Sequence, residues 1–267
     1  MLIKIGNFEF TEVWDGVFYK KLSQYPYISD WEKRTIIEFV EYEASYGRKC
    51  QIECENADVL EEVELALNKR ESYRNAPRPA LITECTACPV RKGCVTEFVF
   101  HTTSPENARK ILECGSLLSA IKARNLTVEE LMAEARNAAK DPPDYFEYIM
   151  LAWGNCQAGD RLVMERKLGR FPDKQDLSVN FTPGVRFYFR YEDLVKHPGR
   201  VFDGVLPMKI KDEIILKDWL YAMVIPVGVE LDVPDDLKDR IIYVENDCRD
   251  IWDWSEKVYQ TIEKRYL

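Results

Sequence analysis

Three closely spaced cysteines constrain this chain more than any other feature of its sequence. Cys85, Cys88 and Cys94 follow a C-x2-C-x5-C spacing. The two-residue gap of a CxxC turn brings two sulfurs within a few ångströms of each other, as a thiolate-bound metal requires. Cys50 and Cys54, in the segment CQIEC, form the other close pair. We therefore expect a metal centre with Cys85, Cys88 and Cys94 as ligands and Cys50 or Cys54 as the fourth.

The metal that this spacing favours is an iron–sulfur cluster or a zinc ion, and a cysteine segment without metal is the weakest of the three interpretations. The segment Cys85 to Cys94 resembles the end of the CxxCPxxxxC cluster loop of endonuclease III- and MutY-type DNA glycosylases, which implies a 4Fe–4S cluster. The resemblance covers ten residues, and Arg78 stands where those enzymes place a further cysteine. It carries over the ligand spacing and not the glycosylase activity.

Composition places the chain among soluble globular proteins, with 46% hydrophobic and 31% charged residues in 267. No apolar run approaches the roughly 20 residues that span a bilayer, and MLIKIGNFEF lacks the apolar core of a signal peptide. We therefore expect a cytoplasmic protein with no membrane partner. The formal net charge of −9 argues against a general nucleic-acid coat but leaves room for a local basic groove.

The first 80 residues predict a small α+β lobe. Apolar alternation over 2–20, interrupted by Gly6-Asn7 and Asp15-Gly16, predicts two or three short antiparallel strands. Helices are expected over 29–47, where Ser29 can cap the first turn, and over 57–73. The segment 75–79 is an expected linker, and 81–97 forms the cysteine-rich metal-binding segment.

The rest of the chain alternates strands with helices. Phe98 to Phe100 predicts a strand that ends on His101, followed by a helix with Ser104 as N-cap, Pro105 as first residue and Gly115 at its end. Helices are also expected over 127–140, as a pair within 144–168, from 183 to 195 and over 250–266. Strands are expected over 177–182, 204–210, 218–226 and 240–245.

The segment 98–119 resembles the opening motif of ADP-ribosyltransferase-like domains, in particular the DarT-type and poly-ADP-ribose polymerase-like groups. In that motif a strand ends in His and Thr, and a helix follows with Asn near its start and Ile-Leu-x-x-Gly at its end. The matching residues are His101, Thr103, Asn107, Ile111, Leu112 and Gly115. The resemblance implies a split mixed β-sheet and a site for NAD, in which His101 binds the adenosine ribose and Thr103 and Asn107 lie beside the cofactor.

The order of the later elements is also similar to that family. The resemblance implies that Phe181 or Tyr188 stacks on the nicotinamide and that Asp218 takes the position of the family's catalytic Glu. A Glu there binds a ribose hydroxyl and stabilises the oxocarbenium-like transition state. Asp is one methylene shorter, and Glu213 or Glu245 could substitute although neither lies in the motif.

Together these features predict an α+β protein. An N-terminal lobe, 1–80, is joined through the cysteine metal centre to an ADP-ribosyltransferase-like domain, 98–267, with a helical insert over 120–176. One functional hypothesis is an NAD-dependent ADP-ribosyltransferase, with His101 and Asp218 as catalytic residues, that modifies nucleic acid or protein in a toxin–antitoxin or phage-defence setting. The other is a catalytically inactive protein of the same fold that binds a partner or senses redox state through a structural metal centre.

Overall fold

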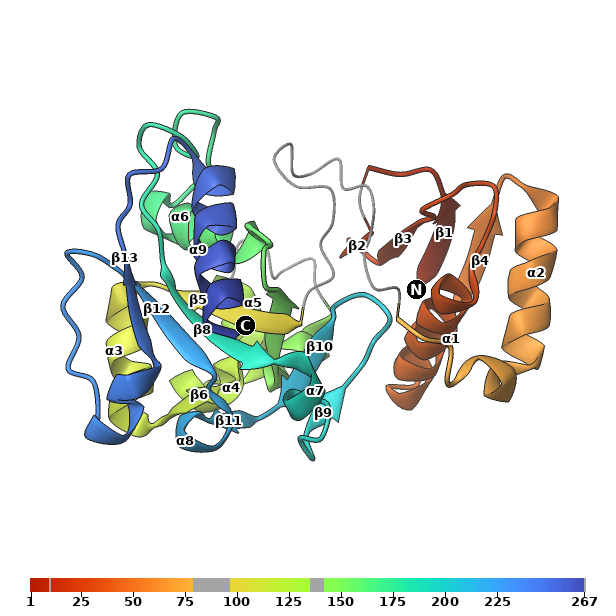
Figure 1. Cartoon of the computed structure of the whole chain (residues 1–267). Helices are drawn as coiled ribbons and strands as arrows, with labels where there is room; N and C mark the ends of the chain where they lie inside the picture. The colour runs from red at the N-terminus through yellow and green to blue at the C-terminus, as the bar shows by residue number, and fades with distance from the viewer. Residues whose placement is uncertain (10, 79–96, 135–141, 267) are drawn as a thin grey trace.

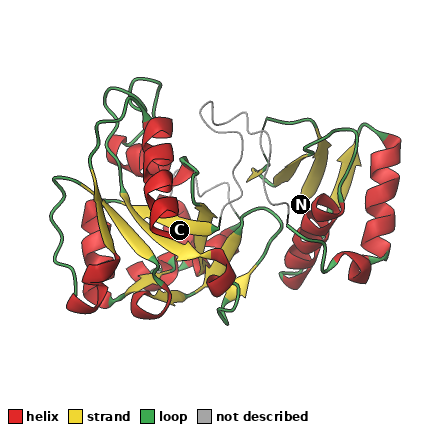
Figure 2. Cartoon of the chain, viewed as in Figure 1, coloured by secondary structure: helices red, strands yellow, loops and turns green. Residues whose placement is uncertain are grey.

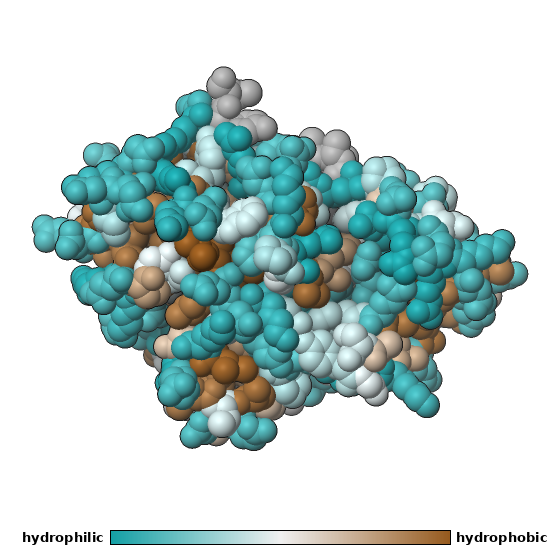
Figure 3. All heavy atoms as spheres, turned by 90° about the horizontal axis from the view of Figure 1, so that it is seen from below, coloured by the Kyte–Doolittle hydropathy of each residue, from teal (hydrophilic) through white to brown (hydrophobic). Residues whose placement is uncertain are grey.

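The chain forms two lobes in a computed structural model that describes residues 1–9, 11–78, 97–134 and 142–266 (Figure 1). Both lobes combine helices with mixed β-sheets, so the predicted α+β class is confirmed. Within the described residues, no helix is both long and apolar enough to cross a bilayer. Seen from below, most of the surface is hydrophilic and the apolar side chains form separate patches (Figure 3).

The N-terminal lobe is built on a four-stranded sheet in the order β2-β3-β1-β4. Its strands are β1 (Leu2–Gly6), β2 (Glu12–Trp14), β3 (Val17–Lys21) and β4 (Gln51–Cys54). The prediction of an antiparallel set is wrong for β1, which pairs in parallel with both β3 and β4; β2 and β3 pair antiparallel. The expected turn is present at Asp15-Gly16, where both residues have positive φ.

Two helices of this lobe begin where their capping residues predict. Helix α1 (Asp30–Ser45) starts with a capping box, in which the Ser29 side chain accepts from the Glu32 amide and the Glu32 carboxylate accepts from the Ser29 amide. Helix α2 (Ala57–Asn68) is capped by Asn56 and continues into the 3-10 turn η1 (Arg70–Tyr73). Apolar residues of both helices join the inward side chains of β1 and β3 in one core.

The C-terminal lobe contains a seven-stranded mixed sheet in the order β13-β12-β8-β5-β7-β10-β9. Its strands are β5 (Phe98–Thr103), β7 (Tyr148–Trp153), β8 (Val185–Arg190), β9 (Arg200–Val201), β10 (Met208–Lys211), β12 (Ala222–Pro226) and β13 (Ile241–Val244). The central strand is β5, which carries the predicted motif. It is buried on both faces apart from His101.

Helices lie over both faces of this sheet (Figures 1 and 2), and each face has its own core. One face is covered by α3 (Pro105–Cys114), the ribbon of β6 (Ser116–Leu118) and β11 (Glu213–Ile215), the turn α8 (Leu216–Trp219) and the 3-10 turn η4 (Asp235–Arg240). The other face is covered by α6 (Ala158–Leu168) and the C-terminal helix α9 (Ile251–Tyr266). Shorter helical elements, which complete the lobe, are α4 (Ala120–Arg124), α5 (Val128–Glu134), η3 (Pro143–Glu147) and α7 (Tyr191–Leu194).

The sheet opens beside β5. Strand β8 pairs with β5 along its whole length, from Phe98 to Thr103. Strand β7 pairs with it at Val99 and Phe100 only, and the rest of β7 pairs with β10. The second half of β5, from His101 onward, therefore has a strand neighbour on one side alone.

Three predicted elements are wrong. The first half of the expected helix pair over 144–168 is η3 and strand β7, because Tyr148–Trp153 is an apolar segment that fits a central strand. The expected strand 177–182 is a turn region, and the expected helix from 183 is strand β8 followed by the single turn α7. The insert 120–176 is therefore not wholly helical. The second half of the helix over 127–140 lies outside the described residues after Glu134.

The loop after β9 attaches the C-terminal lobe to α1. Phe202 stacks on Trp31 with ring centroids 5.7 Å apart, and Val205 packs against the N-terminal core. Gly204 lies directly against the α1 backbone: a side-chain Cβ there would be 1.9 Å from the Thr35 carbonyl oxygen. This contact leaves no room for any residue larger than glycine.

A buried polar cluster makes the second contact between the lobes. The Lys209 Nζ on β10 lies 2.9 Å from the Asp203 carboxylate and 3.7, 4.0 and 4.8 Å from the ring centroids of Tyr42, Tyr145 and Tyr148. Burial lowers the pKa of Lys209, and the charge of Asp203 opposes this shift. Because Tyr42 belongs to α1, the cluster spans both lobes.

Candidate functional site

The predicted strand–His–Thr–helix motif is present and well formed. Strand β5 runs two residues past His101 to Thr103, and the Ser104 side chain then accepts from the Asn107 amide at 3.2 Å. Pro105 is the first residue of α3, and Gly115, with φ of +72°, ends it in the left-handed conformation that glycine adopts freely. The local sequence signals thus fix both ends of α3 and the position of His101 before it.

His101 lies at the opening of the sheet and is partly exposed. Its Nδ1 is 3.5 Å from the carbonyl oxygen of Met150, on the strand that departs from β5. Burial and, to a smaller extent, the charge of Arg166 on α6 lower the pKa of His101 to about 4, although the hydrogen bond with the Met150 carbonyl opposes this shift. The imidazole is therefore neutral at pH 7, so one ring nitrogen can donate a hydrogen bond and the other can accept one.

Two glycines let other segments approach β5 beside His101. A Cβ on Gly159, in the first turn of α6, would lie 2.5 Å from the Thr102 Oγ1. A Cβ on Gly184 would lie 2.7 Å from the Thr103 carbonyl oxygen. The Thr102 hydroxyl is buried and has no hydrogen-bond partner within the described ranges. The strand after His101 is thus closely covered on the α6 side.

A buried ionic network holds α6 in this position. Arg186 on β8 and Asp160 on α6 are both fully buried, and their side chains pair at 2.6 and 2.9 Å. The guanidinium also donates to the hydroxyls of Tyr188 (3.1 Å) and Ser255 (2.6 Å), and the other Asp160 oxygen accepts from the Gly184 amide (3.1 Å). Burial alone would lower the pKa of Arg186, but the charge of Asp160 together with the interactions with Tyr188 outweighs it, and the pKa is raised.

The structure does not gather all the predicted NAD-binding residues at His101. Thr103 is buried two residues further along β5, and Asn107 is exposed on the first turn of α3. Tyr188 and Phe181 lie in the core beneath α6 and α9. Side chains alternate along β5, so His101 points to the same face as Val99, and Val99 belongs to the core beneath α3. Tyr188 and Phe181 are therefore on the opposite face of the sheet from His101.

Asp218 lies away from His101 as well. It is exposed on the turn α8, not at the start of a strand as predicted. Strand β12 begins only at Ala222, which is in register with Tyr188 and, across β8, with Phe100. Asp218 comes before Ala222 in this row of paired residues, and His101 comes after Phe100. The register therefore places Asp218 and His101 toward opposite ends of β5. Of the two possible substitutes, Glu213 lies on β11 and Glu245 is exposed after β13.

The predicted metal ligands divide between described and undescribed residues. Cys85, Cys88 and Cys94 lie outside the described residues. Cys50 directly precedes strand β4, Cys54 is its last residue, and both pack against the N-terminal core. Residues four apart on a strand are separated by about 13 Å, so Cys50 and Cys54 cannot both bind one metal ion with the three other cysteines. Arg78, at the position where the glycosylases have a further cysteine, stacks over the rings of Trp153 and Tyr191, with its Cζ 4.8 and 4.3 Å from their centroids.

The metal centre therefore stays a prediction, in which one of Cys50 and Cys54 is the fourth ligand. No group of three or more metal-binding side chains occurs within 1–9, 11–78, 97–134 and 142–266. Burial and the charge of Glu43 raise the pKa of Cys50, which disfavours its thiolate.

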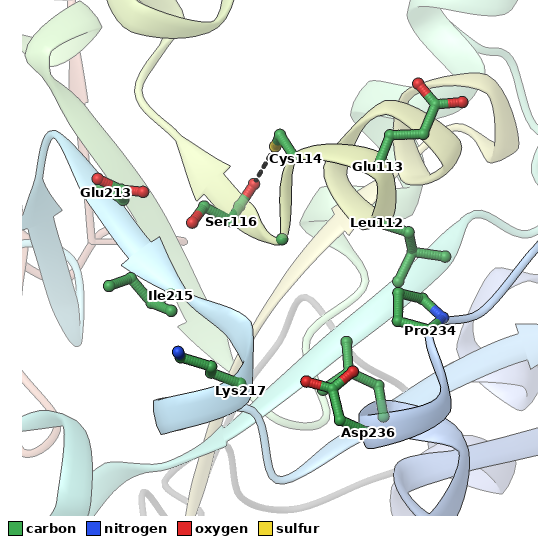
Figure 4. A pocket seen from close by; sticks show the side chains of 11 residues that line it. Leu112, Glu113, Cys114, Ser116, Glu213, Ile215, Lys217, Pro234 and Asp236 are labelled. Atoms are coloured by element: carbon green, nitrogen blue, oxygen red, sulfur yellow. Dashed lines mark hydrogen bonds between the residues drawn. The ribbon is translucent and has the colours of Figure 1, made fainter.

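A cavity of about 430 Å³ opens in the C-terminal lobe at the far end of α3 (Figure 4). Cys114 is exposed in its wall and donates a hydrogen bond to the Ser116 carbonyl oxygen at 3.1 Å. The other lining residues come from α3, β11, α8 and the η4 region: Leu112, Glu113, Gly115, Glu213, Ile215, Lys217, Pro234, Asp236 and Leu237. Helix α3 is ten residues, or about 15 Å, long, so this cavity is distant from His101.

Sequence reasoning missed Arg166, Arg186 and Asp160. Arg186 and Asp160 are separated by 26 positions, and alternation in VRFYFR could have shown that Arg186 faces a core. No local signal identifies its partner. Arg166 lies on α6, and its effect on His101 depends on how α6 crosses the sheet, for which the sequence has no local signal.

Comparison with known proteins adds no relative. No protein-family model matches the chain. No curated protein and no solved structure matches it significantly either.

Proposed function

We propose that residues 98–267 form an NAD-binding domain of the ADP-ribosyltransferase-like class, and that the protein transfers ADP-ribose from NAD to a nucleic-acid or protein acceptor. The observation that carries the proposal is the position of His101. It lies within the resembling motif, is partly exposed where β7 leaves β5, and is followed by Thr103 and the capped helix α3. The resemblance implies a split mixed sheet in which a strand carrying His and Thr leads into a helix.

The chemistry available at this position suits ribose recognition. With its pKa lowered to about 4, the imidazole of His101 is uncharged at neutral pH and can accept one hydrogen bond and donate another. Arg166 places a positive charge close by, which favours the diphosphate of NAD. The N-terminus of α3, beyond Thr103, adds a favourable dipole for the same anion.

The second candidate is a binding protein of the same fold without transferase activity. It is favoured by the register that separates Asp218 from His101, and by the burial of Tyr188 and Phe181 on the other face of the sheet. Transfer requires a group that stabilises the developing positive charge as nicotinamide leaves. Binding of NAD does not require such a group.

Calorimetric titration with NAD and a nicotinamide-release assay separate these candidates. Wild type, His101→Ala, Asp218→Asn and the control His197→Ala are compared, with single-stranded DNA, RNA and protein offered as acceptors. The transferase is supported if NAD binds, nicotinamide is released with one acceptor, and His101→Ala abolishes both while His197→Ala changes neither. Binding without release by any acceptor supports the second candidate. No binding of NAD by the wild type refutes both.

A further inference from the structure

The N-terminal lobe contains a larger cavity, of about 660 Å³, that lies apart from the proposed NAD site and has Cys54, one of the two candidates for the fourth metal ligand, in its lining. This is within the range of small-molecule sites, roughly 300–1,000 Å³. It is lined by residues of β1, β4, α2 and the loops that follow the strands: Lys4, Ile5, Gly6, Asn7, Phe8, Tyr25, Ile52, Glu53, Cys54, Glu55 and Leu60.

The cavity lies at one particular edge of the sheet. Strands β1, β3 and β4 are parallel, so their carboxyl ends meet at the same edge. Asn7 and Phe8 follow β1, Tyr25 lies in the loop after β3, and Glu55 follows β4. Open sheets of parallel strands bind their ligands in the crevice outside these ends, where loops from separate strands converge. The predicted antiparallel arrangement would not have placed these loops together.

The charged side chains of the cavity favour a cation. Glu53 and Glu55 both line it, and Lys4 is the one basic residue among its lining residues. Lys4 lies 3.9 Å from the Glu53 carboxylate, so these two charges largely offset each other. Glu55 forms no ion pair with any residue in the described part of the chain. An anion such as a phosphate would therefore meet an unbalanced negative charge.

The nearby start of α2 does not reverse this preference. The Asn56 side chain already accepts from the Val59 amide at 3.0 Å, which satisfies one of the free amides of the first turn. Asp58 adds a further negative charge in that turn. The positive end of the α2 dipole thus already interacts with Asn56 and Asp58 of the chain itself.

Two aromatic rings complete the cavity. Phe8 is partly buried and packs edge-on against Tyr19 with centroids 5.4 Å apart, which holds its ring in place. Tyr25 is also partly buried, and its pKa is raised by burial and by the neighbouring Cys54 and Glu55. A ring and a carboxylate side by side are the usual components of a site for an organic ammonium group.

We propose that this cavity binds a small organic cation, a primary or substituted amine with an apolar or aromatic body. Glu55 pairs with the ammonium group, and the rings of Phe8 and Tyr25 contact the body of the ligand. Ile5, Ile52 and Leu60 supply the apolar floor. The site is independent of NAD and of the split sheet.

The test uses the full-length protein and two probes of matched shape, phenethylammonium and 3-phenylpropionate. Affinities are measured by ligand-observed NMR and calorimetric titration. We expect phenethylammonium to bind at least tenfold more tightly than 3-phenylpropionate. Glu55→Gln should weaken its binding at least fivefold and Tyr25→Leu at least threefold, whereas Glu61→Gln, exposed on α2 outside the cavity, should leave it unchanged.

Three results would overturn the proposal. They are no binding of phenethylammonium at millimolar concentration, equal or tighter binding of the carboxylate probe, and an unchanged affinity in Glu55→Gln. The His101→Ala variant serves as the control for the other lobe. It should bind phenethylammonium as the wild type does, whatever it shows with NAD.

Discussion

Replacement of Gly204 by alanine should separate the two lobes. Gly204 has φ of +73°, and an added Cβ would lie 1.9 Å from the Thr35 carbonyl oxygen and 3.1 Å from the Phe39 amide nitrogen. Both atoms belong to the backbone of α1, whose hydrogen bonds prevent them from moving aside. The overlap can be relieved only if the loop after β9 withdraws from α1.

The expected loss of stability follows from what that withdrawal breaks. The left-handed conformation costs an alanine about 1–2 kcal/mol. The stacking of Phe202 on Trp31 contributes about 0.5–1.5 kcal/mol beyond its buried area, and Val205 loses its contact with the N-terminal core. We expect a total decrease of about 3–5 kcal/mol in the free energy of unfolding, or a fall of roughly 10 °C in Tm.

Gly228 provides the matched control. It has φ of +90° but open space where a Cβ would lie. Gly228→Ala should therefore show the conformational cost alone, about 1–2 kcal/mol. Urea unfolding followed by circular dichroism compares the two variants. Equal losses in Gly204→Ala and Gly228→Ala would refute the close contact between the loop and α1.

Two further predictions concern the surroundings of the proposed NAD site. Arg186→Met leaves the Asp160 carboxylate buried without its partner and should lower the free energy of unfolding in urea by about 3–5 kcal/mol. The control Arg161→Met removes an exposed side chain and should change this free energy by less than about 0.5 kcal/mol. A small loss in both variants would contradict the buried pair. Because folding lowers the pKa of His101 to about 4, the unfolded chain takes up the proton first as the pH falls, so the wild type should lose stability between about pH 6.5 and 4. Urea unfolding of His101→Gln should show a smaller loss over the same range, and an equal loss would contradict the lowered pKa.

Capping residues made the helix boundaries predictable. Ser29, Ser104 and Gly115 each act through neighbours within a few positions, so the sequence alone contains what fixes the ends of α1 and α3. The apolar face of the segment 250–266 likewise predicts a helix, and the structure has α9 there. These signals are local, and the structure confirms them.

Pairing between distant segments was not predictable in this way. Tyr148–Trp153 has a composition that suits a buried helix or strand, and its pairing with β5 and β10 decides between them. Pro183-Gly184 predicts a helix start. In the structure the chain passes so closely over Thr103 that position 184 has no room for a side chain, and a strand follows. The parallel pairing of β1 with β4 joins residues about 49 positions apart, for which the sequence offers no turn signal.

The candidate site was predictable only in part, for the same reason. His101, Thr103 and Asn107 lie within one local motif, and their relation along β5 and α3 is as expected. The roles of Tyr188 and Asp218 at the NAD site follow only from the resemblance of later elements of the chain to the family. The register of β8 and β12 places these two residues away from His101. Side-chain alternation on a sheet makes such an assignment sensitive to a shift of a single residue.

The histidine rings allow the most direct test of the NAD site. The chain contains two histidines, His101 and His197, so a protein labelled with ¹³C-histidine gives two sets of ring signals, which the His197→Gln variant assigns. NAD is then added up to about 2 mM, above the usual range of KM values. The account predicts that the His101 signals shift and saturate while those of His197 stay in place. His101 signals that do not move, or that move no more than those of His197, would contradict it.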